Sequence, residues 1–187
     1  MMKLLQFAIA LMVFFLIGMN IQANKQPIDT PAPAFSISDA EGTEHKFPGN
    51  HEGVEIYLFW ATWCPYCKAL MPHLQSIQIE YGDAVRIYAL HIRDDEDPGA
   101  FLDKQGYDFI LLPSADPVMK PYGVVASPAL FLVDRKGNIR LNLYELIFDQ
   151  PEISELPVYH RNHLAMQQDH RYLELSRQAT LHQKTEE

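Results

Sequence analysis

The sequence lacks features that mark several common classes of protein. It holds only two Cys among 187 residues, which excludes a scaffold held together by several disulfides. Lys and Arg number 15 against 24 Asp and Glu, and no basic block occurs, so binding to nucleic acid phosphates is not expected. No internal repeat is visible. Hydrophobic residues still make up 48% of the chain, which excludes disorder throughout and suits one globular domain.

The one long apolar run lies at the N-terminus. Lys3 precedes residues 4–19, which are almost wholly apolar, and Ala23 offers a small residue at a plausible cleavage point. This layout predicts a secretory signal peptide over residues 1–23. The run is shorter than the roughly 20 residues of a membrane-spanning helix, so cleavage is favoured over retention as a membrane anchor. Either alternative predicts export to the periplasm or another extracytoplasmic, oxidising space.

The rest of the chain divides into three parts by composition. Residues 24–33 are rich in Pro and are expected to form an extended linker. Residues 34–148 carry the patterns of strands and helices and are expected to form the domain. Residues 149–187 are predicted to add a C-terminal helical extension, and they hold four of the eight His: His160, His163, His170 and His182.

The domain alternates predicted strands with predicted helices. Residues 54–60 are apolar at nearly every position, as in a central strand covered on both faces. Residues 65–81 follow as a helix, with Pro65 near its first position and Gly82 at its end. Further strands are expected at 84–92, 108–112, 129–133 and 139–143, short helices at 98–105 and 116–122, and a hairpin at 35–38 and 43–47. This order predicts an α/β fold with a mixed central sheet flanked by helices.

Two Cys stand where the central strand gives way to the helix. Unpaired N–H groups and the helix dipole at a helix N-terminus favour negative charge, so the pKa of the Cys64 thiol is expected to be lowered. The resulting thiolate is the form that attacks a disulfide. Cys67 lies one turn further along and suits the second step, in which the substrate is released. At this spacing the two thiols can also close a small disulfide.

Other uses of this Cys pair fit the sequence less well. Structural zinc needs four ligands, and the distant His160 and His163 are the only paired candidates, so no metal is expected. Covalent haem attachment needs a His where Lys68 stands. A peroxidatic Cys would need Pro and Thr where Tyr57 and Ala61 stand. A purely structural disulfide remains an alternative, although such a small loop restrains the unfolded chain little.

The sequence around the pair resembles a known family. The stretch FWATWCPYC at residues 59–67 resembles the active site of the thioredoxin superfamily. Residues 32–42 resemble the N-terminal hairpin of its exported, TlpA-like thiol–disulfide oxidoreductases, and residues 122–137 resemble their cis-proline strand and hairpin. The resemblance runs from about residue 31 to 143. It implies a thioredoxin-like fold with an N-terminal β-hairpin, to which this chain adds an extra C-terminal helix.

The resemblance also assigns roles to individual residues. It implies that Cys64 is the attacking thiol and Cys67 the resolving thiol. It implies a cis-proline at Pro128 that leaves the backbone of Ser127 free to pair with an extended substrate. The remaining candidate substrate contacts are Trp63, Pro65 and Tyr66.

The implied activity is disulfide exchange with protein substrates, without a cofactor and with electrons from a redox partner that is expected to be membrane-bound. A reductase is favoured over an oxidase. An isomerase and a redox-inactive binding or assembly module remain alternatives.

Two positions depart from the family pattern. Leu58 replaces a buried Asp found in many thioredoxins, and Leu70 replaces a Glu common in exported reductases. The Pro65-Tyr66 dipeptide matches glutaredoxin, whose potentials of about −200 to −230 mV lie above thioredoxin's value of about −270 mV. His91 is expected to be packed rather than catalytic, and the acidic run at residues 93–97 to be a solvated connection.

Overall fold

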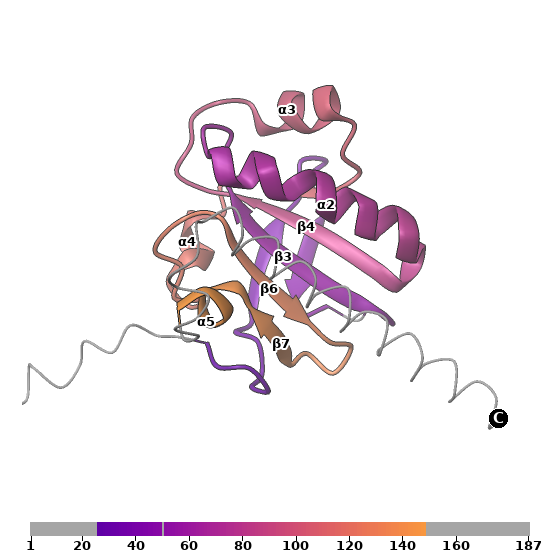
Figure 1. Ribbon diagram of the computed structural model, residues 1–187, viewed down its shortest axis with the longest axis vertical. Coiled ribbons are helices and arrows are strands. Elements are labelled where there is room, and N and C mark those ends of the chain that lie inside the picture. The colour runs from indigo at the N-terminus through magenta and orange to yellow at the C-terminus, as the bar shows by residue number, and fades with distance from the viewer. Residues whose placement is uncertain (1–25, 50, 149–187) are drawn as a thin grey trace, which may run out of the picture.

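The structure is a computed structural model that describes residues 26–49 and 51–148. Five strands form a mixed sheet in the order β5-β4-β3-β6-β7 (Figure 1). The three strands on one side run parallel, and β6 and β7 are each antiparallel to their inner neighbour. The strands are β3 (Val54–Trp60), β4 (Val85–His91), β5 (Ile110–Leu112), β6 (Ala129–Val133) and β7 (Ile139–Asn142).

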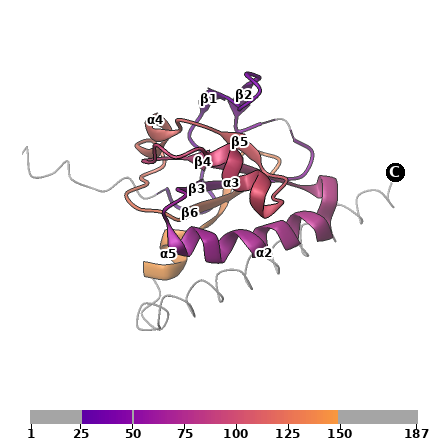
Figure 2. The same cartoon turned by 90° about the horizontal axis from the view of Figure 1, so that it is seen from above.

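Helices and a hairpin cover the two faces of this sheet. One face carries the long helix α2 and the short helix α5, and the other carries the β1–β2 hairpin and α4 (Figure 2). Helix α3 packs through Leu102 into the same core layer as α2. These elements are β1 (Phe35–Ser38), β2 (Glu44–Phe47), α2 (Pro65–Tyr81), the 3-10 turn η1 (Gly82–Ala84), α3 (Pro98–Gln105), α4 (Asp116–Met119) and α5 (Leu143–Phe148).

Strand β3 holds the two core layers together. Successive side chains of a strand point to opposite faces, so Ile56, Leu58 and Trp60 pack in the layer of α2. Tyr57 and Phe59 point the other way and pack beneath the hairpin and α4. All seven residues of β3 are buried, as expected for a strand covered on both faces. This burial fixes the point at which the chain leaves the sheet, just before the Cys pair.

Most predicted elements are confirmed, and the differences have simple causes. The strands at 54–60 and 129–133 and the helices at 65–81 and 98–105 have the predicted bounds. The thioredoxin-like fold and its N-terminal hairpin are confirmed. The last predicted strand ends one residue early, because Leu143 begins the unpredicted helix α5. Leu143 turns its side chain into the core, which a strand pattern also allows.

Residues 26–33 differ from the expected spacer, because they are bonded to the edge of the sheet. Thr30 and Ile139 on β7 face one another, and the Ile139 N–H donates to the Thr30 carbonyl at 2.8 Å. The N–H groups of Asp29 and Ala32 donate to the carbonyls of Ile139 and Gly137 at 2.7 and 2.8 Å. At the opposite edge, the Ala40 N–H from the hairpin turn donates to Leu111 of β5 at 3.2 Å. Both edge strands therefore have partners outside the sheet.

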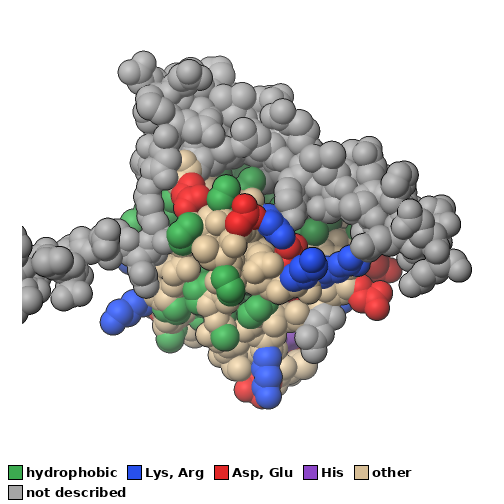
Figure 3. Space-filling view, turned by 90° about the horizontal axis from the view of Figure 1, so that it is seen from below, with side chains coloured by type: hydrophobic (Ala, Val, Ile, Leu, Met, Phe, Trp, Pro, Cys, Tyr) green, Lys and Arg blue, Asp and Glu red, His purple; other side chains and the backbone are tan. Residues whose placement is uncertain are grey.

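Two of the expected segments cannot be compared with the structure. The signal peptide over 1–23 and the helical extension over 149–187 lie outside the described residues. Among the helices of residues 26–49 and 51–148, none has the length and apolar character to cross a membrane. On the face shown in Figure 3, acidic, basic and hydrophobic side chains are interspersed.

Helix α2 offers a matched pair of residues that tests this packing. Ile77 is fully buried, whereas Ile79, on the same helix, is 74% exposed. We expect Ile77→Ala to lower the free energy of unfolding by about 2–5 kcal/mol, because it leaves a cavity in the core. Ile79→Ala should change it by less than about 0.5 kcal/mol. Urea denaturation of both variants measures the difference, and similar losses in the two would contradict the described orientation of α2.

Candidate active site

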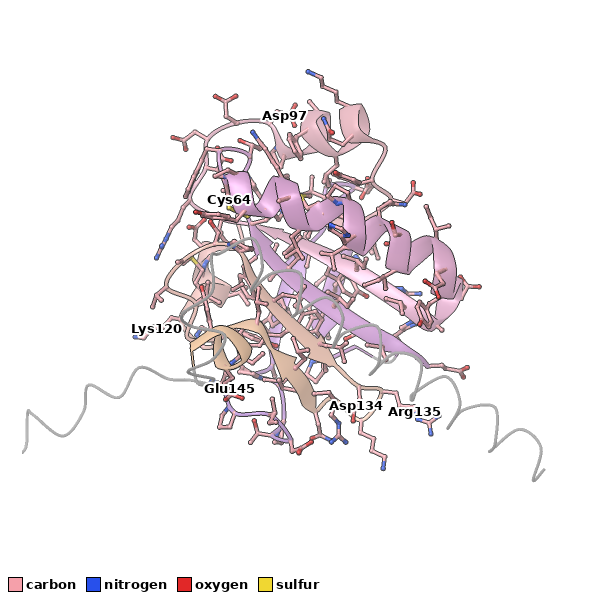
Figure 4. All side chains as sticks on the ribbon, viewed as in Figure 1. Cys64, Asp97, Lys120, Asp134, Arg135 and Glu145 are labelled. Carbon is pink, nitrogen blue, oxygen red and sulfur yellow. A yellow bond between two sulfur atoms is a disulfide. The ribbon has the colours of Figure 1, made fainter. Side chains whose placement is uncertain are left out.

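The Cys pair lies just beyond the carboxyl end of β3, where α2 begins (Figure 4). Cys64 is the N-cap of α2, and Pro65 occupies the first turn, where a missing N–H costs nothing. The two Cys form a disulfide with a Cα–Cα distance of 5.3 Å. Cys64 is only 1% exposed and Cys67 is fully buried. The position predicted from the sequence is thus confirmed, and the expected orientation of Cys67 toward the core with it.

The start of α2 supplies the electrostatics of the pair. The Cys67 N–H donates to the Cys64 Sγ at 3.2 Å, so this sulfur takes the place of a capping oxygen. The 17-residue helix adds its dipole, and its first turn holds no acidic residue. When the pair is reduced, these groups stabilise negative charge on Cys64.

The two departures from the family pattern, Leu58 and Leu70, are buried apolar residues in the same core layer.

The predicted cis-proline lies at the same end of the sheet. The Ser127–Pro128 peptide bond is cis, and Ala129, directly after it, is the first residue of β6 and pairs with Phe59 on β3. Because Phe59 and Cys64 are separated by only four residues, this register brings the proline loop and the Cys loop together. Ser127 itself precedes the paired residues of β6.

Exposed apolar side chains occur on both of these loops. Trp63 is 58% exposed, Tyr66 46% and Val125 69%, and they are three of five large hydrophobic residues exposed in the described part of the chain. Trp60 is instead fully buried, in agreement with a packing role. Trp63, Pro65 and Tyr66 are thus exposed next to the Cys pair, and their role as substrate contacts stays a prediction.

Sequence reasoning missed a buried carboxylate that holds the Cys loop. The Thr62 N–H donates to Asp94 Oδ2 at 2.5 Å, and His91 Nε2 lies 3.1 Å from the same oxygen. The side chains of Asp94 and His91 are 3% and 5% exposed. The expectation of a solvated connection at residues 93–97 is therefore wrong for Asp94. Asp97 is exposed, as expected, and its carboxylate also caps α3 by accepting from the Ala100 N–H at 3.1 Å.

The electrostatics of Asp94 follow from these bonds. Burial alone would raise the pKa of its carboxyl group, but the hydrogen bonds from Thr62 and Glu96, together with the nearby His91 ring, favour the ionised form and outweigh it. The pKa of Asp94 is about 2, against an ordinary value of 3.8. An ionised carboxylate thus fixes the backbone two residues before Cys64. No local pattern in the sequence marks Asp94, because its role depends on the parallel pairing of β3 and β4, whose carboxyl ends emerge at the same edge.

No metal centre emerges from the described residues. Within residues 26–49 and 51–148, no three His, Cys, Asp or Glu side chains are grouped so that they could share an ion. The paired His160 and His163 considered above lie outside these residues.

The chain is similar in sequence to known proteins. Residues 28–142 match the AhpC/TSA family. The chain belongs to this family. It is 30% identical over 142 residues to the thiol–disulfide oxidoreductase ResA of Geobacillus thermodenitrificans, an alignment that covers 71% of this chain and 81% of ResA. It is 31% identical over 142 residues to the thiol:disulfide interchange protein DsbE of Allochromatium vinosum, covering 71% and 76%.

Solved structures agree on the fold. The thioredoxin domain of a Bacteroides vulgatus thiol–disulfide oxidoreductase has a TM-score of 0.56 at 22% identity, covering 62% of this chain and 87% of that domain. A thiol:disulfide interchange protein from Bacteroides sp. has a TM-score of 0.54 at 21% identity, covering 72% and 98%. The resemblance to TlpA-like proteins is confirmed, and this member of the AhpC/TSA family is a thiol–disulfide oxidoreductase.

The ionisation of Asp94 predicts a specific dependence of stability on pH. Because its pKa is lower in the folded state, its contribution is complete above about pH 4 and is lost as the pH falls through about 2. We expect the stability advantage of the wild type over Asp94→Asn to shrink across this range. Urea denaturation of the oxidised proteins at several pH values measures it. Asp95→Asn controls for charge loss in the same loop, and parallel profiles of the wild type and Asp94→Asn would contradict the prediction.

Proposed function

We propose that this protein reduces disulfides in exported protein substrates through Cys64 and Cys67. The observation that carries the proposal is the placement of Cys64. Its sulfur caps α2, accepts a hydrogen bond from the Cys67 N–H, and lies at the sheet end that also holds the cis-proline loop. A thiolate stabilised in this way, with a second thiol one helical turn away, is suited to two-step disulfide exchange.

The reaction consists of two balanced exchanges. The Cys64 thiolate attacks one sulfur of the substrate disulfide, so a mixed disulfide forms and one substrate thiolate leaves. The Cys67 thiolate then attacks Cys64 Sγ, which forms the Cys64–Cys67 disulfide and releases the second substrate thiolate. Two electrons pass to the substrate. A dithiol in a redox partner, which we expect to be membrane-bound, restores the reduced pair by the same chemistry in reverse.

The substrate is expected to bind along the proline loop. Ser127 precedes the paired part of β6, so its backbone can add an extended segment of the substrate to the sheet end. Trp63, Tyr66 and Val125 expose apolar surface on either side of this position. Pro65 shares the exposed face of the Cys loop. An extended, partly apolar protein segment that contains a disulfide fits this arrangement better than a small polar molecule.

We infer the direction of electron flow from the groups that stabilise the Cys64 thiolate. A strong oxidant needs a strongly stabilised reduced form, as in DsbA at about −120 mV. Here the stabilisation comes from one backbone N–H and the helix dipole, and the residue between Pro65 and Cys67 is the uncharged Tyr66. We infer that the pair favours the disulfide form more than DsbA does, and that it acts as a reductase.

The sequence outside the described residues supports an exported location. The apolar run at residues 4–19 after Lys3 is the basis for proposing a signal peptide over 1–23, with an uncleaved anchor as the alternative. Residues 149–187 are proposed to form a helical extension beyond the domain. Fractionation of the producing cell, with intact mass of the protein, tests both export and cleavage.

Two Cys variants test the mechanism. Cys64→Ser should abolish reduction of a protein disulfide, because the attacking sulfur is lost. Cys67→Ala should retain the first step and accumulate mixed disulfides with the substrate, because no resolving thiol remains. Gel electrophoresis under non-reducing conditions and mass spectrometry measure both. Full activity in Cys64→Ser would refute the assignment, and biological activity in a protein without either Cys would favour a binding module.

The reduction potential tests the direction. Equilibration of the purified domain against glutathione buffers should give a value at or below about −200 mV, in the range of glutaredoxins and thioredoxin. Tyr66→His is an informative companion, since a neighbouring positive charge stabilises the thiolate and should raise the potential. A wild-type value near −120 mV would show instead an oxidant that introduces disulfides.

A further inference from the structure

Arg93 connects three segments at the edge of the candidate active site. Its guanidinium group donates to the carbonyl of Val125 in the proline loop at 2.8 Å. Its own carbonyl accepts from Trp63 Nε1 in the Cys loop at 3.0 Å, and its N–H donates to Asp116 Oδ1 at the start of α4 at 3.1 Å. One residue thus joins the Trp63 side of the site to the Val125 side.

The backbone of Arg93 is held in an uncommon conformation. Its φ is 51°, in the left-handed region that residues with a Cβ seldom occupy. The bonds to Trp63 and Asp116 engage both backbone polar groups, which keeps this conformation in place. The neighbouring Asp94 anchors the same segment to Thr62. The guanidinium group therefore extends toward Val125 from a fixed base rather than from a free loop.

The proline loop is also held by Tyr144. The Tyr144 hydroxyl accepts from the Ala126 N–H at 3.0 Å and donates to the Ala126 carbonyl. Arg93 and Tyr144 together thus engage polar backbone groups of Val125 and Ala126, immediately before Ser127. The position of Ser127 depends on both, and Arg93 alone also contacts the Cys loop.

We propose that Arg93 is a positioning residue for protein substrates, which sets the distance between Trp63 and the proline loop so that a strand can bind at Ser127. This inference rests on the proposed function and adds a determinant of specificity to it. Arg93 takes no part in the exchange itself. A small disulfide needs access only to Cys64, whereas a protein segment must contact both loops at once, so loss of the guanidinium bond should penalise the protein substrate more.

Arg93→Met tests the proposal, because Met keeps an unbranched apolar stem and removes every side-chain donor while the backbone N–H stays. The two probes are insulin, a protein disulfide, and 5,5′-dithiobis(2-nitrobenzoic acid), a small one, each with the pre-reduced full chain. A hydrogen bond from a charged group supports a loss of about tenfold in the second-order rate constant of this single exchange for insulin relative to the small disulfide. The loss should appear mainly as a higher insulin concentration at which the rate is half-saturated. Arg93→Lys, which keeps a cationic donor, should recover part of it.

Arg135→Ala is the matched control, since Arg135 lies in the β6–β7 turn, at the opposite end of the molecule from Cys64 (Figure 4). It should leave the ratio of the two rates at its wild-type value. Equal losses on both probes in Arg93→Met would overturn the proposal, because they would indicate altered reactivity of the Cys pair. Wild-type rates on both probes in Arg93→Met would overturn it too. So would an Arg93→Lys variant that shows the same loss as Arg93→Met. A wild type that reduces neither probe would instead refute the proposed function.

Discussion

The organisation of the site depends on the hydrogen bond between the Cys67 N–H and the sulfur of Cys64. It exists only because a fully buried strand ends four residues before Cys64 and a long helix begins directly after Cys64. Burial on both faces of β3 fixes the starting point of the loop, and Pro65 fixes where the helix begins. The same N–H that caps the helix stabilises charge on the sulfur, so the capping of α2 and the reactivity of the pair have one physical origin.

Residues at and just after the end of strand β4 make a second set of contacts that support the site. His91, Arg93 and Asp94 contact the Cys loop, α4 and the proline loop through both backbone and side-chain groups. None of these residues carries a sulfur that takes part in the proposed exchange. They occupy this position because β3 and β4 are parallel neighbours whose carboxyl ends emerge side by side. The segment that precedes α3 is therefore part of the site, although it is some thirty residues from the Cys pair in the sequence.

The fold and the Cys pair were predictable because their signals are local. An uninterrupted apolar run, a Pro at a helix start and a Gly at its end mark β3 and α2 without any knowledge of tertiary contacts. The roles of Arg93, Asp94 and Tyr144 were not predictable in the same way. Charged side chains and hydroxyl groups are typical of solvated segments. Only the pairing of the strands shows which backbone groups these three residues bond to. Residues 26–33 were likewise read as a spacer, because nothing in a Pro-rich segment reveals the β7 edge to which it binds.

The covered edges of the sheet have a consequence for a protein that handles extended chains. Residues 26–33 occupy the outer side of β7, and β5 is only three residues long and is bonded to the hairpin turn at Ala40. An exposed edge would pair with any strand-like segment that approached it. Such edge pairing between chains leads to aggregation. Among the described residues, both edge strands are bonded to other segments, so the strand addition proposed before β6 would not compete with pairing at either edge.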